Sequence, residues 1–587
     1  MAVSVAVLPV IAASCSDEDP ILQGSGISEA EWAQINDVDL KGELVVYEFE
    51  ASSSWQAISS DEWAQLLTPS GSAGLSSLRV EVAPNDGTEG RSATITIQSE
   101  GYSEPEIITL RQGEGTLEKG DGRYRDINSW IYDFMESHYL WNENIPQLKL
   151  DFSLDYQKFL TSMLDGIAAM DNVNAEDGVW ENGVRTSYFS EISSNAPISR
   201  TAGDRLLGSG LSIIPSMMDG VDKKTYLGFA VRWVTPGSPA DAEGLKRGDF
   251  ITKVNNIAVT EQNYQNLGGM VLNGNCTVDI NEVEFNQNGA VTVTPKNSVM
   301  IGKDYYMDPS IYTSKIITTK SGKKVAYLNY MGFNMNYDDE LIDAFAAFKS
   351  AGVTDLIVDL RFNIGGHVLS STVMGTLIAG PAHEGEIYVR TSYNSARTAA
   401  GEVGEYRIGK PGNPEQYAGY DKITDALSQS LGLKNVYLIV SGYTASASEL
   451  VINGLRGLDI NVNLIGTTTL GKNVGMEGQR KTWHNYTFDF YPITFYCENA
   501  KGFRDYSDGF NPDVEFDDSN YYPFDFGTTE DALSRLALQW VDSGSKPNSR
   551  AAASGFSAVN KITVLPMTPE LEAPMKNRLG GCIQLRD

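Results

Sequence analysis

Three loops in the second half of the chain carry the residue types best suited to chemistry. They read "DLRFNIGG" (Asp359–Gly366), "TASASE" (Thr444–Glu449) and "GTTTLGK" (Gly466–Lys472). Each loop follows an apolar run that is typical of a buried strand. Because sites in open α/β sheets collect beyond the carboxyl ends of the strands, we expect the three loops to meet at one edge of a sheet.

The second loop holds two serines, Ser446 and Ser448, ahead of an amphipathic segment, Glu449–Leu458. One serine is enough to cap a helix, so the other is available as a nucleophile. A hydroxyl needs a base to take its proton, and Lys472 could do so if burial away from carboxylates keeps its amine uncharged. The pattern indicates a hydrolase with a Ser–Lys pair.

Backbone amides in the same loops could bind the negative charge that develops on a carbonyl oxygen. Gly365 and Gly366 allow the backbone to approach closely and offer N–H donors. The amide of Ala447, at the start of the predicted helix, would supply a second donor, aided by the helix dipole.

Two alternatives remain open. His367 directly follows the two glycines, so a Ser–His arrangement must be weighed, although no acidic partner stands at a readable spacing. The chain could also be a catalytically inactive peptide- or glycan-binding surface protein in which the serine and the lysine are relics.

Composition excludes several classes of function. The net charge of −31 repels phosphate backbones, so nucleic acid is not an expected partner. The four cysteines form no C-x-x-C pattern and the four histidines no H-E-x-x-H pattern, so no metal site is expected. The predicted chemistry requires no cofactor.

The first residues indicate a lipid anchor. Ala2–Ala13 is apolar but too short to span a bilayer, and it runs into Ala-Ser-Cys, followed by "SDEDP". This pattern is typical of a lipoprotein signal with Cys15 as the lipidated residue. The acidic run resembles the export tag of surface-exposed lipoproteins, which implies an outer-membrane lipoprotein of the bacterial cell envelope, surface-exposed or periplasmic.

The N-terminal third holds two different patterns. Residues 17–115 alternate apolar and polar residues, as in "RSATITIQS", and predict a small β-sandwich. The order of Trp55, Trp63, Asn85, Arg91 and the Arg111–Gln112 pair resembles a BACON-type Ig-like domain, a family linked to glycan contact; we expect a spacer with both tryptophans in its core. Beyond a Gly/Glu-rich linker, Asp126 to about Ala196 looks helical.

Residues 204–300 predict short strands around one short helix. The run from Gly237 to Asn255, with its spaced glycines, resembles a PDZ domain of the bacterial protease type. The resemblance implies that the loop Gly208, Ser209, Gly210, Leu211 captures a peptide C-terminal carboxylate with its backbone amides. The peptide would then add as a strand at the sheet edge.

The three loops together resemble the C-terminal-processing (tail-specific) family of Ser–Lys peptidases over roughly residues 125–530. The resemblance makes Ser446 the nucleophile, Ser448 the capping residue and Lys472 the general base. It assigns supporting roles to Arg361, Gly365, Glu449 and Thr469. One departure is Met476, which stands where the family often has a Gln that orients the lysine; Gln479 or Glu477 could replace it.

We therefore predict a multidomain α+β chain that acts as a serine endopeptidase. Its parts are a signal segment (1–15), an Ig-like β-sandwich (17–115), a helical module (120–203), a PDZ-like domain (204–300), an α/β protease core (301–545) and a C-terminal tail (546–587). The expected partners are protein or peptide substrates, with glycan contact through the N-terminal domain and the membrane reached only through the lipid.

Overall fold

The computed structural model describes residues 3–7, 37–38, 44–51, 53–83, 85, 90–100, 105–112, 124–181, 183–195, 205–410, 420–483, 486–548, 560–572 and 574. The chain divides into two compact units: residues 1–202 with 478–492, and residues 203–477 with 493–587. No helix in these described stretches is both long and apolar enough to cross a bilayer.

The first unit begins with a β-sandwich, as the alternating pattern predicts. One sheet has the order β1 (Val3–Val7), β3 (Leu44–Ala51), β7 (Gly74–Val82), β5 (Ala64–Leu66). The other has the order β2 (Asp37–Val38), β9 (Glu106–Gln112), β8 (Arg91–Ser99), β4 (Trp55–Ser59), β6 (Ser70–Gly71). Strand β1 takes up part of the predicted signal segment and pairs in parallel with β3.

The two tryptophans of the sandwich lie in or against its core, as expected. Trp55 is 2% exposed and donates from Nε1 to Ser76 Oγ at 3.0 Å. Trp63 is half-buried against the same cluster, with the guanidinium of Arg91 4.4 Å from the ring centroid. Both side chains are accounted for by packing.

The rest of the first unit is only half helical. Helices α2 (Arg125–His138) and α3 (Tyr156–Ala168) flank the short helix η1 (Asn142–Gln147), and α2 buries Ile127, Ile131 and Met135 at helical spacing. Helical structure ends with η2 (Ala175–Asp177). The expectation of helix up to Ala196 is wrong beyond this point, because strands follow: β10 (Gly178–Glu181), β11 (Val184–Tyr188) and β12 (Glu191–Asn195). Strand β12 pairs with β30 (Tyr486–Tyr491), which pairs with β29 (Gln479–Trp483), so its partner lies nearly 300 residues away in sequence.

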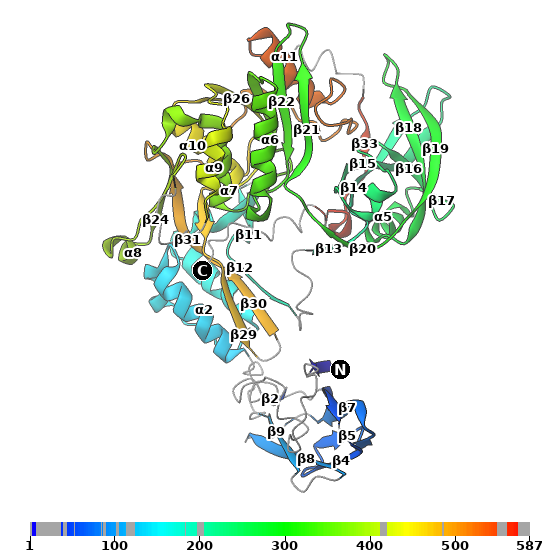
Figure 1. Ribbon diagram of the computed structural model, residues 1–587, viewed down its shortest axis with the longest axis vertical. Coiled ribbons are helices and arrows are strands. Elements are labelled where there is room, and N and C mark those ends of the chain that lie inside the picture. The colour runs from blue at the N-terminus through cyan, green and yellow to red at the C-terminus, as the bar shows by residue number, and fades with distance from the viewer. Residues whose placement is uncertain are drawn as a thin grey trace. The chain divides into compact units, whose positions relative to one another are not determined.

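The second unit contains a PDZ-like sheet (Figure 1). Its strand order is β19 (Val291–Ile301), β18 (Cys276–Phe285), β16 (Phe250–Val254), β15 (Thr225–Val234), β14 (Leu211–Asp219), β33 (Thr563–Val564), with β17 (Ile257–Ala258) paired to β16. Helices α4 (Pro239–Ala242) and α5 (Tyr264–Asn273) belong to this domain, and β13 (Arg205–Gly208) pairs with β20 (Asp304–Met307). The last strand of the sheet, β33, comes from the segment that the sequence predicts to be a tail.

The remainder of the second unit is the α/β core. Its sheet has the order β21 (Ile311–Thr318), β22 (Lys324–Tyr330), β23 (Asp355–Asp359), β26 (Asn435–Val440), β27 (Asn461–Gly466), β32 (Val514–Glu515). All pairings from β22 to β32 are parallel, and only β21 is antiparallel. The predicted largely parallel sheet is confirmed.

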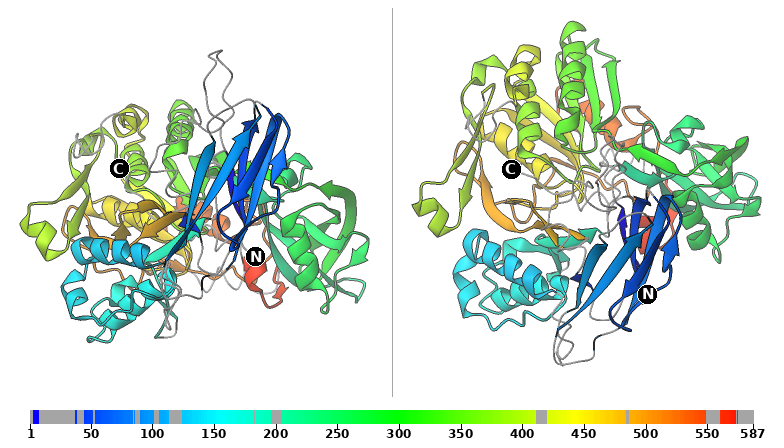
Figure 2. Two further views of the ribbon diagram at one scale, coloured as in Figure 1. Left: turned by 90° about the horizontal axis from the view of Figure 1, so that it is seen from below. Right: turned by 60° about the horizontal axis from the view of Figure 1, so that its bottom comes forward.

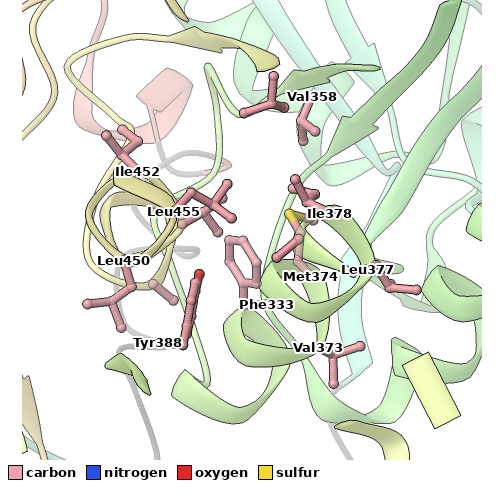
Figure 3. Close-up of a cluster of buried hydrophobic side chains, with 14 of the residues drawn as sticks. Phe333, Val358, Val373, Met374, Leu377, Ile378, Tyr388, Leu450, Ile452 and Leu455 are labelled. Atoms are coloured by element: carbon pink, nitrogen blue, oxygen red, sulfur yellow. The ribbon is translucent and has the colours of Figure 1, made fainter. Parts of the chain in front are cut away.

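Helices cover both faces of this sheet, because its strands are apolar on both sides. Val358 of β23 packs with α6 (Asp338–Ser350), α7 (Val368–Ala379), α9 (Lys422–Gln429) and α10 (Ala447–Gly457). Its neighbour Ile357 packs in a second cluster with α11 (Ala532–Ser543). Figure 3 shows side chains of α7 and α10 meeting beside Phe333 in the first cluster.

A smaller antiparallel sheet completes the core and carries the chain past Lys472. Its order is β25 (Gly404–Arg407), β24 (Ile387–Tyr393), β31 (Ile493–Glu498), β28 (Val474–Met476). The short helices η3 (Met335–Tyr337), η4 (Pro381–His383) and α8 (Ser395–Ala399) lie in the connections.

Candidate active site

Ser446 lies at the junction between β26 and α10 in a strained backbone conformation. Its φ and ψ are 57° and −118°, a combination that non-glycine residues rarely adopt. The residue is 1% exposed, and its Oγ has no hydrogen-bond partner among the described residues. A strained residue with an unpartnered buried hydroxyl is a candidate for function rather than for stability.

The two serines divide their roles differently from the prediction. Ser446, not Ser448, occupies the N-cap position of α10. Ser448 lies in the first helical turn, where its Oγ donates to the backbone oxygen of Asn363 at 3.0 Å. The expectation that Ser448 caps the helix is therefore wrong, because its hydroxyl ties α10 to the glycine loop instead.

Glu449 joins the serine loop to the lysine loop. Its Oε2 accepts hydrogen bonds from the backbone nitrogens of Ser446 at 2.9 Å and Lys472 at 2.8 Å. Its Oε1 accepts from Gly471 N at 2.8 Å and from Thr469 Oγ at 2.6 Å. One carboxylate oxygen thus holds the backbone of both residues of the predicted pair.

Glu449 is fully buried, and burial raises the pKa of its carboxyl to about 7 against the lowering effect of its four hydrogen bonds. Thr469 completes the connection, because its hydroxyl also accepts from Phe510 N at 2.7 Å. The supporting positions predicted at Glu449 and Thr469 are in direct contact with each other.

The side chain of Lys472 lies among sulfur atoms. It is 1% exposed, and its Nζ donates to Met476 Sδ at 3.7 Å. Burial raises the pKa of the nearby Cys497 thiol to about 12, although the charge of Lys472 acts to lower it. Met476 thus contacts the amine itself through a weak acceptor.

Of the two suggested replacements for the family Gln, Glu477 is engaged elsewhere. Glu477 is bound in an ion pair with Arg397, with Oε2 at 2.5 Å and Oε1 at 3.0 Å from the guanidinium nitrogens. Gln479 belongs to β29, in the other unit.

Gly365 and Gly366 form a close-packed wall beside Ser446. Their φ angles are +110° and +135°, and a methyl group built on Gly365 would stand 2.7 Å from Ser446 Cβ and 3.0 Å from Ala447 N. The loop is fixed by Phe333, whose N–H donates to Gly365 O at 2.9 Å and whose carbonyl accepts from His367 N at 2.8 Å.

The two predicted oxyanion donors are unused. Neither Gly366 N nor Ala447 N donates to any acceptor in the described part of the chain. Ala447 is the first residue of α10, whose N-terminus favours negative charge. The glycine loop and the helix start therefore bring free donors to the neighbourhood of the Ser446 hydroxyl.

Asn363 is a positioning residue that sequence reasoning missed. Its Nδ2 donates to Tyr330 O at 2.9 Å, and its Oδ1 accepts from Gly365 N at 2.9 Å. Its backbone oxygen accepts the Ser448 hydroxyl. Its place two residues before the glycine pair is the only signal that could have indicated this role.

Arg361 supports the glycine loop through buried ion pairs outside the site. It is 1% exposed and binds Asp359, Asp518 and Asp531, with the NH2–Asp531 Oδ1 distance at 2.8 Å. Burial alone would raise the pKa of Asp531, but Arg361 lowers it to about 2. The network anchors the start of the glycine loop.

His367 is not bonded to Ser446 in this structure, because the serine hydroxyl has no partner among the described residues. The imidazole lies instead among the residues that line a cavity of about 850 Å³. Gly365 and Gly366 line this cavity from the core, while Leu211 and Leu272 line it from the PDZ-like domain.

The predicted carboxylate loop, Gly208, Ser209, Gly210 and Leu211, runs from the last residue of β13 to the first residue of β14. Ser209 N donates to Leu272 O at 3.0 Å, and Leu211 N to Ser209 Oγ at 3.3 Å. At least two of the four amides, those of Ser209 and Leu211, are therefore engaged within the domain. Cys15, the predicted lipidation site, lies outside the described residues.

Four family models match the chain. The model of Peptidase family S41 matches residues 324–516, and that of the Peptidase S41 N-terminal domain matches residues 126–172. The PDZ domain model matches residues 231–281. BACON, an N-terminal domain family to which binding is ascribed, matches residues 53–113.

Similar proteins are named processing proteases. The carboxy-terminal processing protease CtpA of Bacillus subtilis (strain 168) is 24% identical over 236 residues, which are 40% of this chain and 42% of that protein. A carboxyl-terminal-processing protease of Picosynechococcus sp. (strain ATCC 27264 / PCC 7002 / PR-6) is 24% identical over 250 residues, 41% of this chain and 49% of that protein. The chain thus spans less than half the length of these relatives.

A solved structure agrees with these matches. It is a protein of Bacteroides fragilis NCTC 9343 assigned to the S41 proteases, 25% identical, with a TM-score of 0.56 over 71% of this chain and 98% of that one. By these findings the chain is similar to peptidases of family S41 over residues 126–172 and 324–516, with a PDZ domain match between these two stretches and a BACON match ahead of them.

Proposed function

We propose that the chain is a serine endopeptidase that uses Ser446 as its nucleophile and Lys472 as its general base. The observation that carries this proposal is the buried carboxylate of Glu449, one oxygen of which holds the backbone nitrogens of both residues. A hydroxyl without a partner and two unused amides beside it supply the other parts of an acyl-transfer site.

The reaction follows from this arrangement. Ser446 Oγ attacks the scissile carbonyl carbon while the Lys472 amine takes the hydroxyl proton, and Gly366 N and Ala447 N bind the oxyanion of the tetrahedral intermediate. The intermediate collapses as the C–N bond breaks and Lys472 returns the proton to the leaving amine. Water then attacks the acyl-serine with the same base, releasing the acid and restoring Ser446.

The substrates are protein or peptide chains. The cavity of about 850 Å³ connects residues of the PDZ-like domain with Gly365 and Gly366, and its size suits an extended peptide. A C-terminal or unfolded segment bound by the PDZ-like domain would therefore reach the glycine loop that packs against Ser446 within this cavity.

The test compares cleavage of a permanently unfolded protein, reduced and carboxymethylated lactalbumin, by the wild type and three variants. Ser446→Ala and Lys472→Ala should each lower the cleavage rate by at least about 1000-fold, and the exposed control Lys501→Ala should not change it. Equal cleavage by all variants would remove this mechanism, and no cleavage by the wild type would favour the inactive peptide- or glycan-binding scaffold.

His367→Ala decides the remaining alternative. A Ser–His enzyme should lose its activity in this variant and keep it in Lys472→Ala. The Ser–Lys mechanism predicts the opposite, with His367→Ala changing mainly the KM because the ring lines the cavity.

We also propose that Cys15 carries a lipid that holds the protein at the bacterial outer membrane, and that the N-terminal β-sandwich contacts glycans. The sequence ahead of Cys15 supports the first point, and the resemblance to BACON-type domains supports the second. Cys15→Ser should move the protein from the detergent phase to the aqueous phase on Triton X-114 partitioning. Binding of mucin glycans by the full chain should be lost when residues 37–112 are removed.

A further inference from the structure

The C-terminal segment of the chain occupies the outer edge of the PDZ-like sheet. Strand β33 pairs antiparallel with β14, with Thr563 opposite Met217 and Val564 opposite Ser216. The pairing continues one residue further, where Leu565 N donates to Pro215 O at 2.9 Å. The segment therefore runs along β14 toward its N-terminal end, where the loop Gly208–Leu211 and the cavity lie.

The same segment also contacts the helix beside this edge. Tyr264 of α5 donates from its hydroxyl to Pro566 O at 3.0 Å. Leu571 is 1% exposed in the core cluster of the PDZ-like domain, and a methyl group built on Gly268 of α5 would stand 2.5 Å from Leu571 Cδ2. The segment thus lies between β14 and α5; Figure 1 labels β33 beside β14, and in Figure 2 the red end of the chain again lies beside the green PDZ-like domain.

The start of the segment is fixed to the α/β core. Tyr522 N donates to Asn560 O at 2.8 Å, and Ile562 N donates to Asn520 O at 3.0 Å. Ile562 packs in a cluster with Tyr522 of the core and Phe250 of the PDZ-like domain. The segment therefore connects the two domains.

The segment is held by two buried side chains and by three partly buried hydrophobic ones, Val564, Leu565 and Met567. Ile562 and Leu571 are its only buried side chains among residues 560–572 and 574, and Thr563, Pro566 and Glu570 are exposed. A covalently attached ligand can remain bound through these contacts, because its effective concentration is high. A competing chain with more contacts can displace it.

We propose that residues 560–572 are a built-in ligand of the PDZ-like domain, and that a peptide binds this groove, between β14 and α5, only by displacing them. Strand addition at a free sheet edge is a general mode of peptide capture, and this edge of β14 is already paired. The competitor is an extended chain with aliphatic side chains at the places of Ile562 and Leu571. The inference rests on the proposed capture of peptides by this domain, but it concerns binding and not turnover.

Displacement of the segment would also change the cavity that the glycine loop lines. Glu570 and Pro574 line the same cavity as Gly365 and Gly366, so this end of the chain forms part of the cavity wall. Displacement of the segment opens the groove and this end of the cavity together.

The experiment uses the full chain with Ser446→Ala, so that no probe is cleaved. A recognition site for a specific protease is inserted between Gly555 and Phe556, and the chain is compared before and after cutting. The probe is a fluorescein-labelled synthetic peptide of residues 560–574, and binding is followed by fluorescence anisotropy. The cut chain, freed of its fragment by gel filtration, should bind the probe at least about tenfold more tightly than the intact chain.

Matched peptides test the register. A peptide with Leu571→Asp should bind at least about tenfold more weakly, because the charge would enter the core. A peptide with Thr563→Asp should bind within about threefold of the native one, because that residue is exposed. Equal binding by the intact and cut chains would overturn the proposal, as would absence of binding by a cut chain that keeps its melting temperature.

The intact chain with Leu571→Asp gives a second test that needs no cut. It should bind the native peptide more tightly than the parent chain, and the Leu565 amide should exchange with deuterium faster. Protection of this amide equal to that in the parent would contradict displacement. These readouts do not depend on cleavage, so failure of the proposed peptidase activity would leave them interpretable.

Discussion

Glu449→Gln is the perturbation that most sharply separates catalysis from stability. The amide keeps one acceptor oxygen and replaces the other with a donor. In its better orientation the oxygen still accepts from Ser446 N and Lys472 N, while the new NH₂ group donates to Thr469 Oγ and leaves Gly471 N without an acceptor. A hydrogen bond to a charged acceptor contributes about 1.5–3 kcal/mol.

The lost hydrogen bond is that of Gly471 N, in the loop that carries Lys472, the proposed base. If its loss is expressed in the transition state, kcat/KM should fall about 10- to 100-fold. Stability should change little, because burial of the charge already works against the ionised carboxyl and the amide removes that cost. The assay is cleavage of a quenched fluorogenic peptide at pH 8, with thermal unfolding of the same samples.

Asp338→Asn is the matched control. Asp338 is also buried, and burial raises the pKa of its carboxyl to about 7, but its partners are the hydroxyls of Ser370 and Tyr420. This variant should keep kcat/KM within about threefold. If Glu449→Gln keeps full activity, or if Asp338→Asn loses as much, the role assigned to the Glu449 carboxylate is refuted.

The raised pKa of Glu449 also predicts how stability depends on pH. The folded chain binds this proton more tightly than the unfolded chain, whose carboxyl has a pKa near 4.5, so this contribution is complete below pH 4.5 and is lost as the pH rises through 7. From these two values the loss is roughly 3 kcal/mol. Urea unfolding at pH 5 and pH 8 should show a smaller decline in Glu449→Gln than in the wild type, because Asp338 contributes a decline of its own to both chains; equal declines would contradict the contribution of Glu449.

Three further substitutions test other parts of the site. Gly365→Ala should abolish measurable cleavage, because its methyl group would collide with Ser446, the proposed nucleophile. The control Gly322→Ala, at φ +86° with nothing within 4 Å, carries similar backbone strain and should stay active. An active Gly365→Ala would show that the close packing of Gly365 against Ser446 is not needed. Met476→Leu should lower kcat about 3- to 10-fold with an unchanged melting temperature. Met476→Gln should restore kcat, since the amide oxygen is a stronger acceptor for the Lys472 amine than sulfur. Equal kcat in both variants would mean that the Met476 sulfur does not orient the base. Arg361→Met should lower the free energy of unfolding in urea by about 3–5 kcal/mol, because it leaves buried carboxylates without a partner. The control Lys501→Ala, which removes an exposed ion pair, should lower it by less than about 1 kcal/mol. Similar losses in the two variants would contradict a stabilising role of the buried network.

Much of the fold is readable from the sequence, because buried parallel strands and amphipathic helices leave strong patterns. The strand that ends at Asp359, the helix after Ser446 and the parallel order of the core sheet are of this kind. Short strands without a local partner are not readable in this way. Strand β12 pairs with residues about 300 positions later, and β33 is a two-residue strand next to Pro566.

The site shows the same division. The three loops and the position of Glu449 follow from strand order and spacing. The side-chain contacts do not, because they depend on rotamers and distant neighbours: Asn363 holds the glycine loop, Ser448 bonds to it, and Met476 faces the amine. A serine at the helix start is a good cap on propensity alone, so the choice between the two serines needed the backbone conformation.

The central claim is that the amine of Lys472 lies beside the side chain of residue 446, and a thiol placed there measures this directly. The Ser446→Cys chain and the Ser446→Cys/Lys472→Met chain are treated with methyl methanethiosulfonate across pH 5–10, and the rate at position 446 is read by mass spectrometry of its peptide. A neighbouring ammonium stabilises the thiolate, so the apparent pKa of the thiol should be at least about one unit lower when Lys472 is present. The same apparent pKa in both chains would contradict the account.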